Sequence, residues 1–182
     1  MNIFIKFIIL LFFLSACDSN LVNHNISTKN NILYQAAEKI GLDERINRQE
    51  IKEFTGVDPV HTEWCAAFVN SVLRESDIPG SDSVSDVPLM ARSFLFWGEP
   101  ITKENIYPGD IVVFPRGNQG WQGHVGFYIG TEIVDGTEFY RILGGNQNNK
   151  VSIELFRVDT VLGIRRYSNE LINTNVVNRA IN

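Results

Sequence analysis

The sequence is poor in residues that build metal centres. It has only two cysteines and three histidines among 182 residues. One of the histidines, His24, lies in a polar stretch near the N-terminus. The remaining two histidines and Cys65 make a poor ligand set for a transition metal. We therefore expect no metal site and no cofactor.

Clusters of basic residues are also missing. The formal net charge is −5, with 16 Lys and Arg against 21 Asp and Glu. Nucleic-acid binding needs clustered positive charge to neutralise phosphates, so nucleic acid is not an expected partner. The length and the apolar fraction of 44% suit one globular domain with a real core.

The sequence contains no apolar run long enough for a membrane span. "MNIFIKFIILLFFLSAC" carries Lys6, then an apolar run of about ten residues, where a span needs roughly 20. Small residues precede Cys17, as in a secretory signal peptide over 1–16. "LSAC" also resembles the bacterial lipobox, in which the cysteine is lipidated and becomes the new N-terminus. We expect an exported protein that is lipid-anchored through Cys17 to the bacterial cell membrane and faces the periplasm or cell wall. The alternatives are an uncleaved anchor helix and a secreted protein without lipid.

This interpretation leaves Cys65 without a disulfide partner. Exported proteins with two cysteines often pair them. If Cys17 carries lipid, Cys65 is a free thiol in an oxidising compartment, which is a liability unless the thiol is used. The cysteine count therefore favours a function for Cys65.

The patterns along the chain predict an α+β domain over 32–167, in which N-terminal helices pack on a C-terminal antiparallel β-sheet. Residues 17–31 are polar and predict a flexible tether, and 168–182 form a polar tail. The expected helices cover 32–41, 43–56, 62–76 and 89–98. The expected strands cover 109–114, 124–130, 139–145, 151–156 and 161–167.

Cys65 lies where a nucleophile would be activated. Thr62 is a plausible N-cap, which places Cys65 in the first turn of the third helix. Free N–H groups there favour a thiolate and can hold an oxyanion. The alternative is structural, because Cys65 shares a helical stripe with Phe68, Val69 and Val72 and could simply fill the core.

His124 is the expected base. His24 falls in the tether, and His61 directly precedes the third helix with no defined direction. On a strand, His124 shares one face with Gly126 and Tyr128. Gly126 would let a helix end approach this face closely. The alternative is an ordinary surface histidine.

A polar side chain must orient the imidazole through its second nitrogen. "GGNQ" offers Asn146, whose amide oxygen suffices for this task, as in Cys-His-Asn sites. Asn146 and Gln147 could instead form only a turn. Asp135 and Asp159 are weaker candidates, since both fall in connections between strands.

Four phrases in this order, "WCAAFVN", "PGDIVVF", "GHVGFY" and "GGNQ", resemble papain-like bacterial cell-wall cysteine hydrolases of the NlpC and CHAP groups. They look most like a little-characterised NlpC-like branch. The resemblance covers roughly 32–167 and implies a helix-packed antiparallel sheet with Cys65 as nucleophile and His124 as base. Asn146 falls at the position of the polar orienting residue, where many NlpC members carry histidine.

These observations lead to a hypothesis of peptide or amide bond hydrolysis in peptidoglycan, through Cys65, His124 and Asn146. Trp64 and Trp121 are candidates for the walls of the cleft. An alternative from another class is a catalytically silent papain-like domain that binds wall peptides or a partner protein. A third possibility is a hydrolase directed at a rival or host cell wall.

Overall fold

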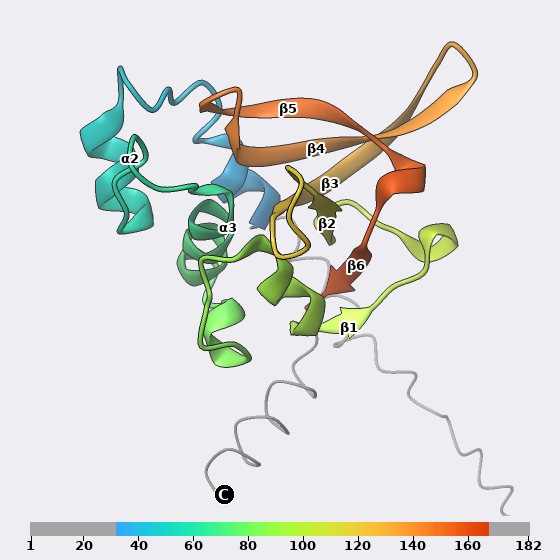
Figure 1. Ribbon diagram of the computed structural model, residues 1–182, viewed down its shortest axis with the longest axis horizontal. Helices are drawn as coiled ribbons and strands as arrows, with labels where there is room; N and C mark the ends of the chain where they lie inside the picture. The colour runs from blue at the N-terminus through green and yellow to red at the C-terminus, as the bar shows by residue number, and fades with distance from the viewer. Residues whose placement is uncertain (1–31, 168–182) are drawn as a thin grey trace, which may run out of the picture.

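The computed structural model describes residues 32–167 and has an α+β architecture. It combines helices from the first half with a six-stranded antiparallel sheet (Figure 1). The expected α+β class is confirmed at this level. The signal peptide, Cys17, the tether and the polar tail all lie outside the described residues. Within 32–167, no helix is both long and apolar enough to cross a membrane.

Residues 32–37 are helical, and the remaining elements follow in chain order. The α-helices are α2 (Arg48–Thr55) and α3 (Cys65–Glu75). The 3-10 helices are Ser81–Ser83, Ala91–Phe96, Lys103–Asn105 and Val158–Thr160. The strands are β1 (Glu99–Pro100), β2 (Ile111–Pro115), β3 (Gly123–Val134), β4 (Thr137–Gln147), β5 (Lys150–Arg157) and β6 (Gly163–Arg166).

All four expected helices differ from the structure. The first ends at residue 37 and is followed by turns over 38–41, and the third covers only Cys65–Glu75. The other two differ for local reasons. The second begins at Arg48, because the Asp43 carboxylate accepts the N–H groups of Arg45 at 2.9 Å and Ile46 at 3.2 Å and forms a turn instead. The fourth is a 3-10 helix. Its buried apolar side chains are Ala91 and Phe94, and Trp97 directly after it is also buried. This spacing of three matches 3.0 residues per turn.

All five expected strand segments pair in the sheet, in the order β1-β6-β2-β3-β4-β5. Strands β2 to β5 follow each other as neighbours. The last strand, β6, returns across the sheet and pairs with β2 and the short β1. The sheet is therefore a meander with one crossover, which places the start of β3 near its centre.

The sheet separates two cores. The larger core lies between the sheet and the helices and includes Phe68 and Val72 of α3 with Val125 and Phe127 of β3. The smaller core on the opposite face includes Phe114, Tyr128, Tyr140 and Ile142. Since successive residues of a strand point to opposite faces, β3 contributes to both.

The β3–β4 hairpin extends well beyond the sheet. Its register runs from Phe127 opposite Leu143 to Val134 opposite Thr137, with a bulge between Tyr128 and Gly130. Figure 1 shows this arm reaching away from α2 and α3, which lie at the other side of the molecule. The turn at its tip is far along both strands from the ends that carry His124 and Gln147.

Candidate active site

Cys65 is the first residue of α3, and the residue before it does not cap the helix. Thr62 is therefore not the N-cap, contrary to our prediction. Trp64 occupies that position, and an indole offers no acceptor. Trp64 is fully buried, and its Nε1–H donates to Glu44 Oε2 at 3.4 Å. No side chain in the described chain caps this end, so the first-turn N–H groups remain able to hold an anion.

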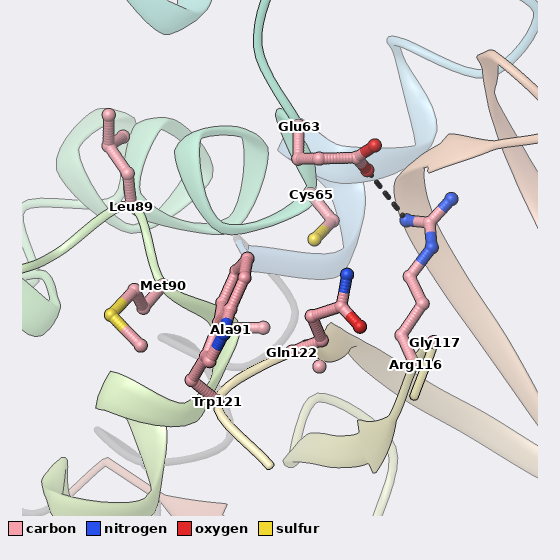
Figure 2. A pocket seen from close by; sticks show the side chains of 10 residues that line it. Glu63, Cys65, Leu89, Met90, Ala91, Arg116, Gly117, Trp121 and Gln122 are labelled. Carbon is pink, nitrogen blue, oxygen red and sulfur yellow. Dashed lines mark ion pairs between the residues drawn. The ribbon is translucent and has the colours of Figure 1, made fainter. Parts of the chain in front are cut away.

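The Cys65 thiol belongs to the core and to a cavity at the same time. Its exposed fraction is only 3%, and it packs in the larger core. It also lines a cavity of about 350 Å³. Figure 2 shows the sulfur directed toward Trp121 and Gln122, beneath the Glu63–Arg116 ion pair. The lining residues are Glu63, Cys65, Leu89, Met90, Ala91, Arg116, Gly117, Trp121, Gln122 and Gly123.

Burial raises the pKa of the Cys65 thiol. Three neighbours act in the opposite direction and lower this pKa: the charge of Arg116, the N–H of Val125 and the N–H of Ala66. The Glu63 carboxylate adds to the rise. Because burial is the largest of these influences, the resting group is a neutral thiol that already has donors placed for a thiolate.

His124 is held on the sheet face opposite α3. Its strand partner is Phe114, and its ring stacks on Phe156 with centroids 5.0 Å apart and an interplanar angle of 9°. The residue is only 3% exposed, and burial lowers the pKa of His124 to about 4. The charge of Arg116 lowers it further, while a hydrogen bond with Gln147 raises it. The resting imidazole is therefore neutral.

Gln147 fixes the tautomer of His124. The Gln147 amide nitrogen donates to the carbonyls of Ile142 at 3.2 Å and Ser152 at 2.6 Å, which fixes the orientation of the amide. Its oxygen then faces His124 Nε2 at 3.0 Å. An amide oxygen only accepts, so Nε2 carries the proton and Nδ1 keeps a lone pair. The ring is thus prepared to accept a proton through Nδ1.

The start of β3 brings His124 and Cys65 together through the backbone. The backbone N–H of Val125, the residue after His124, is one of the groups that lower the pKa of the Cys65 thiol. The two side chains line neighbouring cavities, because His124 borders a second one of about 260 Å³. Among the residues that line these two cavities, only Arg116 borders both. The direct distance between sulfur and ring that we predicted, about 4 Å or less, stays a prediction.

The structure corrects the third position of the site. Gln147 contacts the ring, whereas Asn146 points away and donates from Nδ2 to Glu63 Oε2 at 2.7 Å. The reason is a register shift between Gly144 and Gln147, which inserts one extra residue into β4. Asn146 adopts the left-handed conformation there, with φ +56°. As a result, the side chain of Gln147 is directed toward His124 and that of Asn146 toward Glu63.

The glycine that admits a helix end is Gly145, not Gly126. A Cβ at Gly126 would meet Ile142 of β4 at 2.5 Å, on the face opposite α3. A Cβ at Gly145 would lie 2.6 Å from Trp64 and from Phe68. The expected approach of a helix end to the His124 face of β3 is therefore wrong, because the start of α3 packs against Gly145 of β4 on the other face of the sheet.

The other candidates lie apart from this arrangement. His61 is exposed and lines neither cavity. Asp135 lies in the turn of the β3–β4 hairpin, and Asp159 pairs with Arg157. Trp121 borders the Cys65 cavity as predicted, but Trp64 belongs to the core.

Sequence reasoning missed three residues: Gln147, Glu63 and Arg116. Arg116 directly follows β2, and Glu63 lies two residues before Cys65, where nothing in the sequence pattern distinguishes them. Their ion pair, 3.2 Å between Arg116 Nη1 and Glu63 Oε2, forms only in the fold. Gln147 had a signal, since it is the last residue of the "GGNQ" phrase.

Comparisons with known proteins add no family to this picture. No family model matches the chain, and no curated protein sequence matches it. Across residues 32–167, no group of histidine, cysteine and acidic side chains could hold a metal ion. The case for a function therefore rests on the geometry of the site.

Proposed function

We propose that this protein is a papain-like cysteine peptidase or amidase that hydrolyses peptide or amide bonds in peptidoglycan. The observation that carries the proposal is the convergence of three elements. Cys65 begins an uncapped helix, the N–H of Val125 lowers the pKa of its thiol, and His124, the residue before Val125, is held by Gln147 with Nε2 protonated. A buried histidine locked in one tautomer is the requirement of a general base.

The reaction would proceed in two halves. The Cys65 sulfur attacks the scissile carbonyl carbon, and its proton passes to His124 Nδ1. N–H groups at the start of α3 hold the oxyanion. The carbon–nitrogen bond breaks as His124 returns this proton to the leaving amine, which leaves a thioester on Cys65. Water then attacks the thioester, gives its proton to His124, and releases the carboxylic acid and the thiol.

The low pKa of His124 and the raised pKa of Cys65 define the resting state. Both groups are neutral, so the thiol proton is transferred during attack and not before it. Of the two routes open to such sites, general-base catalysis therefore fits better than a preformed ion pair. Burial favours neutral forms in the free site, and the polar substrate changes that environment when it binds.

Peptidoglycan as the substrate follows from the resemblance to NlpC and CHAP hydrolases and from the expected export signal. The Cys65 cavity is compatible with a peptide, since Leu89, Met90 and Trp121 offer apolar walls and Gln122 offers a polar group. An N-terminal lipid on Cys17 would keep an anionic enzyme near an anionic wall. Wall peptides would be its partners, and no cofactor is needed.

Digestion of purified peptidoglycan with the full-length protein in detergent tests the proposal. Mass analysis should find new amine and carboxyl ends from one type of amide bond. Cys65→Ala should release none of these fragments, and His61→Gln, which changes an exposed histidine outside both cavities, should release them at the normal rate. Intact peptidoglycan after incubation with the wild type, or fragments from Cys65→Ala, would contradict the proposal.

A silent, peptide-binding domain is favoured by one observation. The thiol is only 3% exposed, and its burial raises its pKa, as for a structural cysteine. This alternative predicts that the wild type sediments with peptidoglycan but creates no new ends. Alkylation separates the two functions further. An enzyme thiol should be alkylated rapidly by iodoacetamide at neutral pH, whereas a structural thiol should stay inert in the folded protein.

A further inference from the structure

The phrase "GGNQ" connects the nucleophile's helix to the base, and each of its residues makes a different contact. Gly144 leaves room for the Gln147 side chain, whose Oε1 lies 3.0 Å from where a Cβ would be. Gly145 packs against Trp64 and Phe68 at the start of α3. Asn146 donates to Glu63, and Gln147 bonds to His124. One bulged segment thus contacts both halves of the candidate site.

Asn146, Glu63 and Arg116 close a ring of contacts above the Cys65 thiol. Glu63 Oε2 accepts from Asn146 Nδ2 at 2.7 Å and pairs with Arg116 at 3.2 Å. Arg116 Nη2 in turn donates to the Asn146 carbonyl at 3.4 Å. The Glu63 side chain is 77% exposed and that of Arg116 is 40% exposed, so the ion pair itself adds little stability. The short, charge-assisted bond from Asn146 is the firmer contact.

The position of Asn146 sets the direction of Gln147. The two residues are adjacent, and the left-handed φ of +56° at Asn146 turns the chain so that consecutive side chains reach different elements. If Asn146 loses Glu63, the bulge can relax and carry Gln147 away from His124 Nε2. The nucleophile would keep its place because α3 is packed in the core. The imidazole would lose its fixed direction and tautomer.

We propose that Glu63 is a positioning residue, which ties the bulge through Asn146 so that Gln147 holds His124 in register with Cys65. The proposal rests on the proposed hydrolase function for its kinetic consequences. It assigns Glu63 no contact with the substrate. Its defining expectation is a loss in kcat with KM nearly unchanged, because binding surfaces such as Trp121 are not part of the tether.

Four variants test the proposed positioning role of Glu63 and its bond with Asn146. Glu63→Ala and Asn146→Gly each remove one partner, and glycine keeps the left-handed backbone. Each should lower kcat by about 10- to 100-fold, the range expected for a displacement near 1 Å. Glu63→Gln keeps an acceptor oxygen for Asn146 Nδ2 and should restore most of the rate. The double variant Glu63→Ala with Asn146→Gly should be no slower than the worse single variant, because both changes break the same contact.

The chain offers matched controls. Asn149 has φ +65° and an exposed side chain, so Asn149→Gly repeats the asparagine-to-glycine change two residues after Gln147. Glu75 is exposed at the far end of α3, so Glu75→Ala repeats the loss of a carboxylate. Both should keep wild-type kcat. Multiplying losses in the double variant, or a Glu63→Gln variant as slow as Glu63→Ala, would overturn the proposal.

A second measurement does not depend on hydrolysis. Nitrogen-15 NMR of the His124 ring should report a single Nε2–H tautomer in the wild type and in Glu63→Gln. Glu63→Ala and Asn146→Gly should show averaging between the two tautomers. Unchanged ring signals in both variants would overturn the proposed positioning role of Glu63. If the variants show averaged signals but the wild type cleaves no amide bond, the positioning role of Glu63 is supported and the hydrolase function is contradicted.

Discussion

Acidification should destabilise this protein through His124. The pKa of the His124 imidazole is lowered to about 4 by burial, whereas an exposed histidine has an ordinary value of 6.5. Between pH 6.5 and about 4, His124 is therefore protonated in the unfolded chain but stays neutral in the folded chain. Stability from this residue is fully present above pH 6.5 and is lost as the pH falls toward 4.

The size of the effect follows from these two values. Linkage between a pKa of 6.5 unfolded and about 4 folded lowers the free energy of unfolding by about 2 kcal/mol from pH 8 to pH 5. The loss reaches about 3 kcal/mol at pH 4. No reduction for solvent screening is needed, since the ring is only 3% exposed. The Cys65 thiol stays neutral throughout this range and does not offset the loss.

Urea titrations of the wild type and His124→Gln at pH 8, 7, 6 and 5 measure the contribution of His124 to the free energy of unfolding. Carboxylates contribute to both proteins alike, so the difference between their free energies of unfolding isolates His124. Wild type should lose about 2 kcal/mol relative to His124→Gln by pH 5. His61→Gln should run parallel to wild type. If wild type instead gains stability relative to His124→Gln on acidification, the imidazolium is favoured, the resting site is an ion pair, and the neutral-pair reasoning is refuted.

Further predictions concern the site, the core and the anchor. Gln147→Ala should lower kcat by about 10- to 100-fold in peptidoglycan digestion, since the ring loses its orienting partner; an unchanged rate would contradict this. Gly145→Ala should lower the free energy of unfolding by about 1–3 kcal/mol in urea, because the new Cβ would lie 2.6 Å from atoms at the start of α3. Gly130→Ala, which faces open space, is its control. Asp110→Ala removes a fully buried carboxylate from a bidentate arginine and should cost about 3 kcal/mol, visible as a lower Tm. Cys17→Ala should abolish labelled fatty-acid uptake and move the protein from the membrane to the soluble fraction; a wild type without lipid label would contradict the anchor.

Periodicity predicted which segments form strands and helices, but not their ends. The alternation in 124–130 is strong because Val125 and Phe127 pack on α3 while Tyr128 packs on the other face. Helix ends depend on single interactions that compete with the pattern. Asp43 forms a turn where the second helix was expected to begin, and Trp64 precedes α3 where Thr62 was expected to cap it. Such local competition leaves almost no periodic signal.

The candidate site was predictable residue by residue only where an amino-acid type is rare. Cys65 and His124 stood out because the chain has few thiols and imidazoles. Asparagine, glutamine, glutamate and arginine are common, so their roles depend on direction alone. The bulge in β4 sends Asn146 to Glu63 and Gln147 to His124. A one-residue irregularity of this kind reverses side-chain directions and cannot be derived from alternation.

The long β3–β4 hairpin makes the molecule easy to modify without touching its centre. Its turn, Asp135 and Gly136, joins the strands at the end remote from His124 and Gln147. A fluorophore or affinity handle placed in that turn would extend the arm. The pairing of Phe127 with Leu143, at the other end of the hairpin, would stay the same. Changes in arm length should remove or add residues in facing pairs, because an unpaired deletion would shift one strand and turn its inward side chains outward.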